Sequence, residues 1–144
     1  MSKNAHEVYT FTWTQTTTQL DIGNDIAPHS CTVLDPKSPT TPRATTADLA
    51  IDVSEAEKIY VQCNTTGPAS ATNFDYKIIS SPDGVAYDST GNEYLVASTA
   101  QAITTIKSAA VTPSPHFIKV RLDVNATNVT AAASVTMKVF VNKR

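Results

Sequence analysis

The chain has 144 residues, 41% of them hydrophobic and 17% charged, and its formal net charge at pH 7 is −2. This length fits a single domain, residues 1–144, that can bury a core of its own. The chain has no long basic run and no apolar stretch as long as a membrane-spanning helix, so we expect neither nucleic acid nor a membrane as partner.

The first strand pattern lies near the N-terminus. Tyr9, Phe11 and Trp13 alternate with threonines, and this period of two predicts a strand with an aromatic core face. The alternative is that the three rings line a sugar-binding platform. Residues 31–34 form a second, shorter strand candidate.

Residues 34–46 contain a proline at every third position, namely Pro36, Pro39 and Pro42. This spacing matches the three-residue turn of a polyproline II helix, and no proline can donate a hydrogen bond to a sheet ladder. The sequence therefore predicts an extended loop or arm. Such an arm loses little entropy on docking because it is already extended, so Pro36, Pro39, Pro42 and Arg43 are the candidate partner-binding residues.

Apolar and polar residues continue to alternate through the middle of the chain. Strands are predicted at residues 49–53, 58–64, 73–80, 85–87, 93–97 and 101–110. Residues 81–84 (Ser-Pro-Asp-Gly) are a strong turn signal, because proline presets one φ angle and glycine accepts a positive one. In the last segment Ile103 and Ile106 could also suit a helical turn, but two intervening threonines favour a strand.

The C-terminal third contains two long alternating segments, which we expect to form an antiparallel hairpin around residues 125–133. Their apolar positions are Ile118, Val120, Leu122 and Val124 in the first and Val135, Met137, Val139 and Val141 in the second. With about eight to ten short strands and no convincing helix, the chain is predicted to be all-β. The expected architecture is an antiparallel β-sandwich, for which jelly-roll connections are one option.

Histidines and cysteines show no metal-binding pattern. His6, His29 and His116 are far apart in the sequence, whereas a zinc site needs clustered ligands. Cys31 and Cys63 could form a disulfide, but the polar N-terminus predicts synthesis in a cytoplasm without export, where cysteines are usually reduced and buried. We therefore predict no metal and no other cofactor.

The carboxylates and glycines show no catalytic pattern either. Asp83, Asp88 and Glu93 could offer ligands to Ca²⁺, but their spacing fits no calcium loop, and aspartates in such turns usually cap the backbone. Asp48 and Asp52 are expected on a solvated face. The sequence has no Gly-x-Ser-x-Gly motif, and its four glycines leave no phosphate-binding loop. We predict a protein that is not an enzyme and has no catalytic residues.

Two parts of the chain resemble blocks found in virion proteins of tailed bacteriophages. The first block, at 58–87, is an apolar strand, a loop of small residues, a second strand at 74–80, the Ser-Pro-Asp-Gly turn and Tyr87. The second is Pro-His-Phe-Ile-Lys-Val-Arg at 115–121, followed by a polar loop and the strand at 135–141. In such proteins these segments belong to a β-sandwich that decorates a capsid or forms part of the tail.

The resemblance implies a non-enzymatic capsid decoration (cement) protein at the surface of the virion. Its partners would be the major capsid protein or other virion proteins, and it would form a homo-oligomer, a dimer or a trimer. Two alternatives are a tail or fibre component and a carbohydrate-binding module for host recognition, since similar blocks occur in sugar-binding sandwiches. Exposure of Trp13 and Tyr87 beside a groove would favour sugar binding.

Overall fold

The computed structural model describes residues 6–14, 23–35, 38–66, 74–87, 94–95, 106–111, 116–124 and 134–143. Every regular element in these ranges is a β-strand. The described residues include no helix that is long and apolar enough to cross a membrane. The strands are β1 (His6–Thr14), β2 (Gly23–Ile26), β3 (Ser30–Asp35), β4 (Ser38–Thr45), β5 (Ile51–Asp52), β6 (Ala56–Thr66), β7 (Phe74–Ser81), β8 (Tyr94–Leu95), β9 (Ile106–Val111), β10 (Phe117–Val124) and β11 (Ser134–Lys143).

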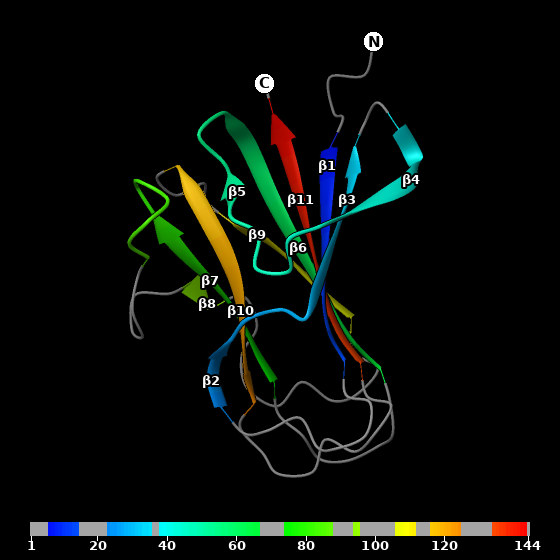
Figure 1. Ribbon diagram of the computed structural model, residues 1–144, viewed down its shortest axis with the longest axis vertical. Helices are drawn as coiled ribbons and strands as arrows, with labels where there is room; N and C mark the ends of the chain where they lie inside the picture. Colours follow the sequence, from blue (N-terminus) through cyan, green and yellow to red (C-terminus); the bar gives the residue numbers. More distant parts are fainter. Residues whose placement is uncertain are drawn as a thin grey trace.

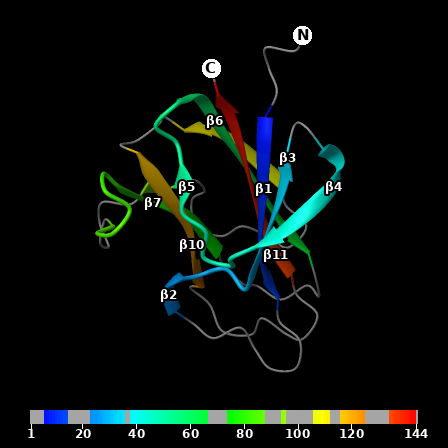
Figure 2. The same cartoon turned by 45° about the horizontal axis from the view of Figure 1, so that its top comes forward.

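The strands form two antiparallel sheets that share one hydrophobic core (Figure 1). The first, which we call the β11 sheet, has six strands in the order β4-β3-β1-β11-β6-β9. The second, the β10 sheet, has the order β2-β10-β7-β8, with β5 also paired to β10. A second view shows the chain crossing between the two layers (Figure 2). The predicted antiparallel β-sandwich is confirmed.

Strand pairing along the chain follows a jelly roll. The first strand pairs with the last, β1 with β11, and then β2 and β5 pair with β10, β6 with β9 and β7 with β8. Each pair is nested inside the one before it, and successive pairs alternate between the two sheets, as in a jelly roll. The β3–β4 hairpin stands outside this nested set and extends the β11 sheet beyond β1.

The predicted hairpin between the last two strands is wrong. β10 pairs with β7 in one sheet, and β11 pairs with β1 and β6 in the other. Residues 125–133 between them are far longer than the two to five residues of a tight hairpin loop. The apolar faces of the two strands meet across the core, so alternation identified the buried faces correctly but did not identify the neighbouring strands.

Other predicted strands are present with different bounds. The segment at 49–53 gives only the two-residue β5, although Ile51 and Val53 are both buried, as the alternation predicted. No strand forms at 85–87, because residues 82–86 are a bend. Residues 106–110 lie in β9, which confirms the strand alternative there, and residues 101–105 lie outside the described ranges.

The core contains the inward faces of both sheets. Trp13, Phe11, Leu122 and Met137 are among its largest fully buried side chains, and each such burial stabilises the fold by about 1.5–3 kcal/mol. Trp13 on β1 also donates its indole N–H to the carbonyl oxygen of Ile26 on β2, 3.0 Å away. This hydrogen bond satisfies the polar atom of a large core side chain and links the two sheets.

Cys31 and Cys63 occupy one row of the β11 sheet but are far apart. Cys31 lies opposite Phe11, which lies opposite Met137 on β11. Met137 in turn lies opposite Cys63. Three strand spacings of about 4.8 Å separate the two cysteines by about 14 Å, roughly twice the reach of a disulfide. Cys31 is a free, buried thiol, as predicted.

The Met137→Ala substitution is expected to lower the free energy of unfolding by about 2–5 kcal/mol, because it leaves a cavity at a fully buried site. The matched control is Lys138→Ala, at the adjacent, exposed position, which should change stability by no more than about 0.5 kcal/mol. Urea denaturation of both variants measures the difference. Equal losses would contradict the assignment of core and solvent faces to β11.

We expect Cys31 to resist alkylation in the folded protein. Burial raises the pKa of its thiol to about 12, so almost no thiolate forms at neutral pH. Mass-spectrometric mapping after iodoacetamide treatment should find Cys31 labelled only in denaturant. Labelling of Cys31 in the folded protein at the rate of a free thiol would show that this position is open to solvent.

Candidate functional site

The proline-rich segment is part of the β11 sheet rather than a free loop or arm. Residues 38–45 form β4, which pairs with β3 and is an edge of the sheet (Figure 1). Proline cannot donate to a ladder, but one side of an edge strand has no ladder to supply. Prolines are therefore accepted at edges and bulges. The prediction of a loop or arm over residues 34–46 is wrong for residues 38–45, which form β4.

The structure places most of the predicted partner-binding residues together on β4. Pro39, Pro42 and Arg43 all lie in this strand, and the side chains of Pro42 and Arg43 are exposed. Pro36 lies outside the described residues, and so does the side chain of Pro39.

A bulge interrupts the pairing of β4 with β3. Arg43 lies opposite Val33, whereas Ser38 lies opposite Asp35. Between these two pairs, the single residue 34 of β3 faces the four residues 39–42 of β4. Residues 39–42 consequently have no register partner on β3. The described side chains among them are exposed. The fold therefore holds this tetrapeptide at both ends and leaves its middle at the surface.

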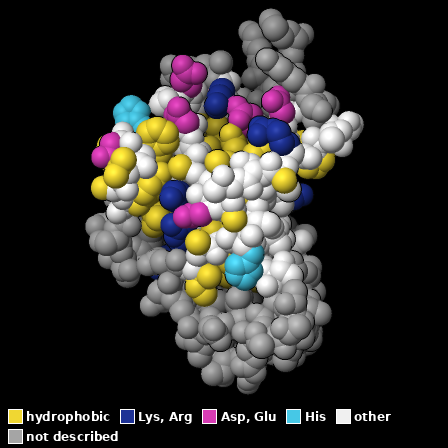
Figure 3. All heavy atoms as spheres, in the orientation of Figure 1, with side chains coloured by type: hydrophobic (Ala, Val, Ile, Leu, Met, Phe, Trp, Pro, Cys, Tyr) yellow, Lys and Arg dark blue, Asp and Glu magenta, His cyan; other side chains and the backbone are white. Residues whose placement is uncertain are grey.

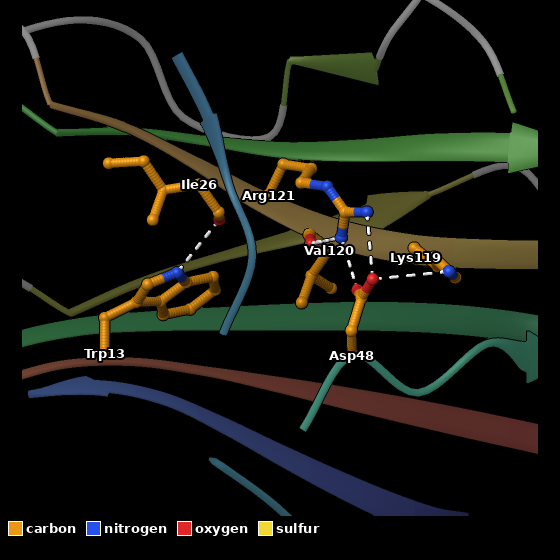
Figure 4. A network of polar contacts seen from close by, with 6 residues as sticks. All are labelled: Trp13, Ile26, Asp48, Lys119, Val120 and Arg121. Atoms are coloured by element: carbon orange, nitrogen blue, oxygen red, sulfur yellow. Dashed lines mark hydrogen bonds and ion pairs between the residues drawn. The ribbon is translucent and has the colours of Figure 1, made fainter. Parts of the chain in front are cut away.

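A polar cluster joins the β4–β5 connection to β10 (Figure 4). The carboxylate of Asp48 accepts hydrogen bonds from both terminal nitrogens of Arg121, one of them at 3.2 Å, and Lys119 Nζ lies 3.3 Å from the same carboxylate. Arg121 also donates to the carbonyl oxygen of Val120 at 2.8 Å. The prediction that Asp48 lies on a solvated face is wrong, because two cations of β10 bind it.

These two cations control the ionisation of Asp48. Partial burial alone would raise the pKa of its carboxyl group, but hydrogen bonds and charges from Arg121 and Lys119 outweigh burial and hold this pKa below its ordinary value. The cluster holds the β4–β5 connection on the edge of β10 between β5 and β2. Its role in this structure is to join the two sheets.

The turn after β7 satisfies its own backbone. Oδ1 of Asp83 accepts hydrogen bonds from the N–H groups two and three residues further on, at 2.8 and 3.0 Å. Gly84 has a φ of 77°, the conformation that the predicted turn requires and that glycine adopts without strain. The predicted role of Asp83 in capping its own backbone is confirmed. Asp88 and Glu93 lie outside the described residues.

The described histidines bond to the backbone. Nδ1 of His29 accepts the N–H of Thr14 at 3.0 Å, which ties the end of β1 to the turn before β3. The carbonyl oxygen of His116 accepts the N–H of Val53 at 2.6 Å. Across the described ranges, no group of three or more His, Cys, Asp or Glu side chains could hold a metal ion.

The aromatic face of β1 is buried, which confirms its predicted place in the core. Phe11 and Trp13 are fully buried, and the hydroxyl of Tyr9 donates to the carboxylate of Glu7. Tyr87 is half-buried, with the ammonium group of Lys119 4.8 Å from the centre of its ring, a cation–π contact. Trp13 and Tyr87 are thus not an exposed pair, and the β1 rings cannot serve as a sugar-binding platform.

Comparison with known proteins leaves the family open. No family model and no curated protein matches the sequence. Two solved structures are similar at 9% identity: infectious bursal disease virus Gx strain, with a TM-score of 0.37, and the VP2 subviral particle of infectious bursal disease virus, with a TM-score of 0.38. They match 99% and 96% of this chain but only 54% and 52% of their own, so this chain spans about half their length. Scores this low assign no function.

The Asp48→Asn substitution should lower the free energy of unfolding at neutral pH by about 1–2 kcal/mol, allowing for partial solvent exposure. It leaves Arg121 and Lys119 without their shared counter-charge. The folded-state pKa of Asp48 is depressed, so wild-type stability from this cluster is present above the unfolded value of 3.8 and is lost as pH falls through the folded value. The variant should lack this part of the acid destabilisation.

Urea denaturation over a series of acidic and neutral pH values tests this account of Asp48. The control is Glu55→Gln, which neutralises an exposed carboxylate in the turn between β5 and β6 and should leave stability almost unchanged. If Asp48→Asn were as stable as wild type at neutral pH, the cluster would not hold the connection in place.

Proposed function

We propose that this chain is a non-enzymatic structural protein of a virus particle, a capsid decoration (cement) protein that binds the major capsid protein at the virion surface. The observation that carries the proposal is the nested strand pairing, because jelly rolls recur in viral capsid and lectin domains. The inference from fold to function is an analogy, so the surface has to support it as well.

The segments that resemble phage virion proteins form the middle of both sheets. The strand at 59–62 lies in β6 and pairs with the strand at 135–141 in β11. The strand at 74–80 lies in β7 and pairs with β10, which contains most of the block at 115–121. The resemblance therefore rests on the two central ladders of the sandwich, and this supports a relation at the level of the whole architecture.

The described surface favours protein binding over sugar binding. Lectins also use the jelly roll, but the β1 rings lie in the core. The exposed residues of β4 are threonine, proline, arginine and alanine, so little charge has to be desolvated when a protein docks there. On the face shown in Figure 3, acidic and basic side chains lie beside one another rather than in a patch of one sign.

We further propose that the chain acts as a dimer or trimer, since decoration proteins sit on a symmetric shell and closed symmetry is the rule for soluble oligomers. The tail or fibre alternative places the same kind of binding protein elsewhere on the particle. Only the location on the particle separates these two proposals, and fractionation of particles decides between them.

Purified virus particles from the source of this sequence should contain the chain in a fixed ratio to the major capsid protein. Quantitative mass spectrometry of gradient-purified particles, followed by separation of heads from tails, measures this ratio. We expect the chain in the head fraction. An abundant host cytoplasmic enzyme, measured in the same fractions, sets the level of contamination.

Two results of this experiment would overturn the proposal at different levels. Recovery in the tail fraction alone would contradict capsid decoration and favour the tail alternative. Absence from particles, or presence only at the level of the host enzyme, would contradict any virion role.

A further inference from the structure

We propose that residues 39–42 together with Arg43 form a docking segment that enters an aromatic-lined groove on another virion protein, where a carboxylate pairs with Arg43. We call these five residues the proline segment. The inference rests on the proposed function, which it deepens by naming the chemistry of the partner surface.

The fold does not bury the described side chains of this segment, those of residues 40–43. The β3–β4 hairpin lies outside the nested pairs of the jelly roll, and only β3 contributes described side chains to the core, namely Cys31 and Val33. The described side chains of residues 40–44 in β4 are all exposed. Since burial does not explain the composition of residues 40–44, the exposed side chains of Pro42 and Arg43 are open to a partner.

The bulge and the prolines disfavour pairing with a further strand. An open edge normally offers a row of N–H and C=O groups to a neighbouring chain, and prolines and bulges are devices that block such pairing. Pro39 and Pro42 have no N–H to donate, and residues 39–42 already lie out of register with β3. A partner that binds here must therefore recognise side chains rather than add a strand.

Prolines three residues apart are suited to an aromatic groove. The ring of proline fixes φ near −65° and keeps the chain extended, and a polyproline II ribbon repeats every third residue, so the rings at i and i+3 share a face. Aromatic-lined grooves bind such ribbons because the ribbon loses little entropy on docking. Pro39 and Pro42 have this spacing, and both lie in the stretch of β4 that has no register partner on β3.

The positive charge of Arg43 indicates that the groove carries a negative charge. Its side chain is exposed and forms no ion pair with another described residue. A guanidinium group pairs with a carboxylate through two parallel hydrogen bonds and also stacks on aromatic rings. The complementary surface therefore carries aromatic rings for the prolines and an aspartate or glutamate beside them.

The described surface of a second copy does not fit this requirement. Tyr60, 38% exposed, is the aromatic residue that reaches the surface most openly among the described residues. It lies on the outer face of the β11 sheet, where the exposed charged side chains are Lys58 and Lys138. Arg43 of another copy would meet like charges there. Because the described residues of a second copy offer no such surface, we assign the groove to a different protein.

Rebinding of the purified protein to particles stripped of it tests the proline segment. The double variant Pro39→Ala/Pro42→Ala should bind about fourfold to thirtyfold more weakly in a co-sedimentation assay, because alanines leave more chain entropy to be lost on docking. Arg43→Glu should bind about tenfold or more weakly, since it places a like charge beside the carboxylate. Added salt should weaken wild-type binding and have less effect on Arg43→Glu.

Matched controls separate this segment from the rest of the surface. Pro82→Ala changes an exposed proline in the turn after β7, and Lys138→Glu reverses an exposed charge on the outer face of the β11 sheet. Both should bind as tightly as wild type. Thermal unfolding of every variant checks the fold, and Arg43→Glu keeps the test decisive if the double proline variant is unstable.

Photocrosslinking identifies the partner surface directly. A benzoylphenylalanine at Thr41 should crosslink, in assembled particles, to a peptide of another virion protein that contains aromatic and acidic residues. The control is the same group at Val85, which is 84% exposed on the turn after β7.

The inference would be overturned if the proline and arginine variants bound like wild type. A Thr41 crosslink only to a second copy, or none at all while the protein is present in particles, would also overturn it. In those cases the proposed function stands. Absence of the wild-type protein from particles would instead contradict the proposed function itself.

Discussion

The strands β1, β6, β10 and β11 each have one apolar face, and the need to remove these faces from water determines the rest of the arrangement. The inward side chains of β10 and β11 are at most 1% exposed wherever the structure describes them. Two such sheets exclude water only by facing each other. Because β10 and β11 follow one another but lie in different sheets, the chain crosses the sandwich between them. Repeated crossings of this kind produce the nested pairs.

Two polar contacts link the two sheets where the chain crosses between them. The indole of Trp13 on β1 reaches the carbonyl of Ile26 on β2, and Asp48 after β4 reaches Arg121 on β10 (Figure 4). Both contacts tie a strand or connection of one sheet to the other sheet. Neither contact involves an exposed side chain of β4, and the described core contains none of them. This separation of the stabilising contacts from the β4 surface is what allows β4 to be assigned to a partner.

Sequence reasoning succeeded where the signal was local and failed where it was not. Period-two alternation identified the buried face of β11, because successive side chains of a strand point to opposite faces and the apolar ones face the core. It could not show that β10 and β11 lie in different sheets, since alternation says nothing about neighbouring strands. Asp48 looked like a solvated residue because its partner Arg121 is 73 positions away. The prolines were correctly taken to lack backbone N–H donors. An edge strand such as β4 does not need those donors on its open side, so the prolines did not exclude a strand.

The central claim is that this jelly roll binds a virus particle through β4, and a high-resolution reconstruction of the particle by electron cryomicroscopy tests it most directly. The account predicts jelly-roll density outside the shell, with the Pro39–Pro42 bulge in a groove of a capsid subunit and Arg43 beside an acidic side chain. Jelly-roll density with β4 facing solvent would contradict the claim about β4. A complete reconstruction in which every density is explained by other chains would contradict the virion role.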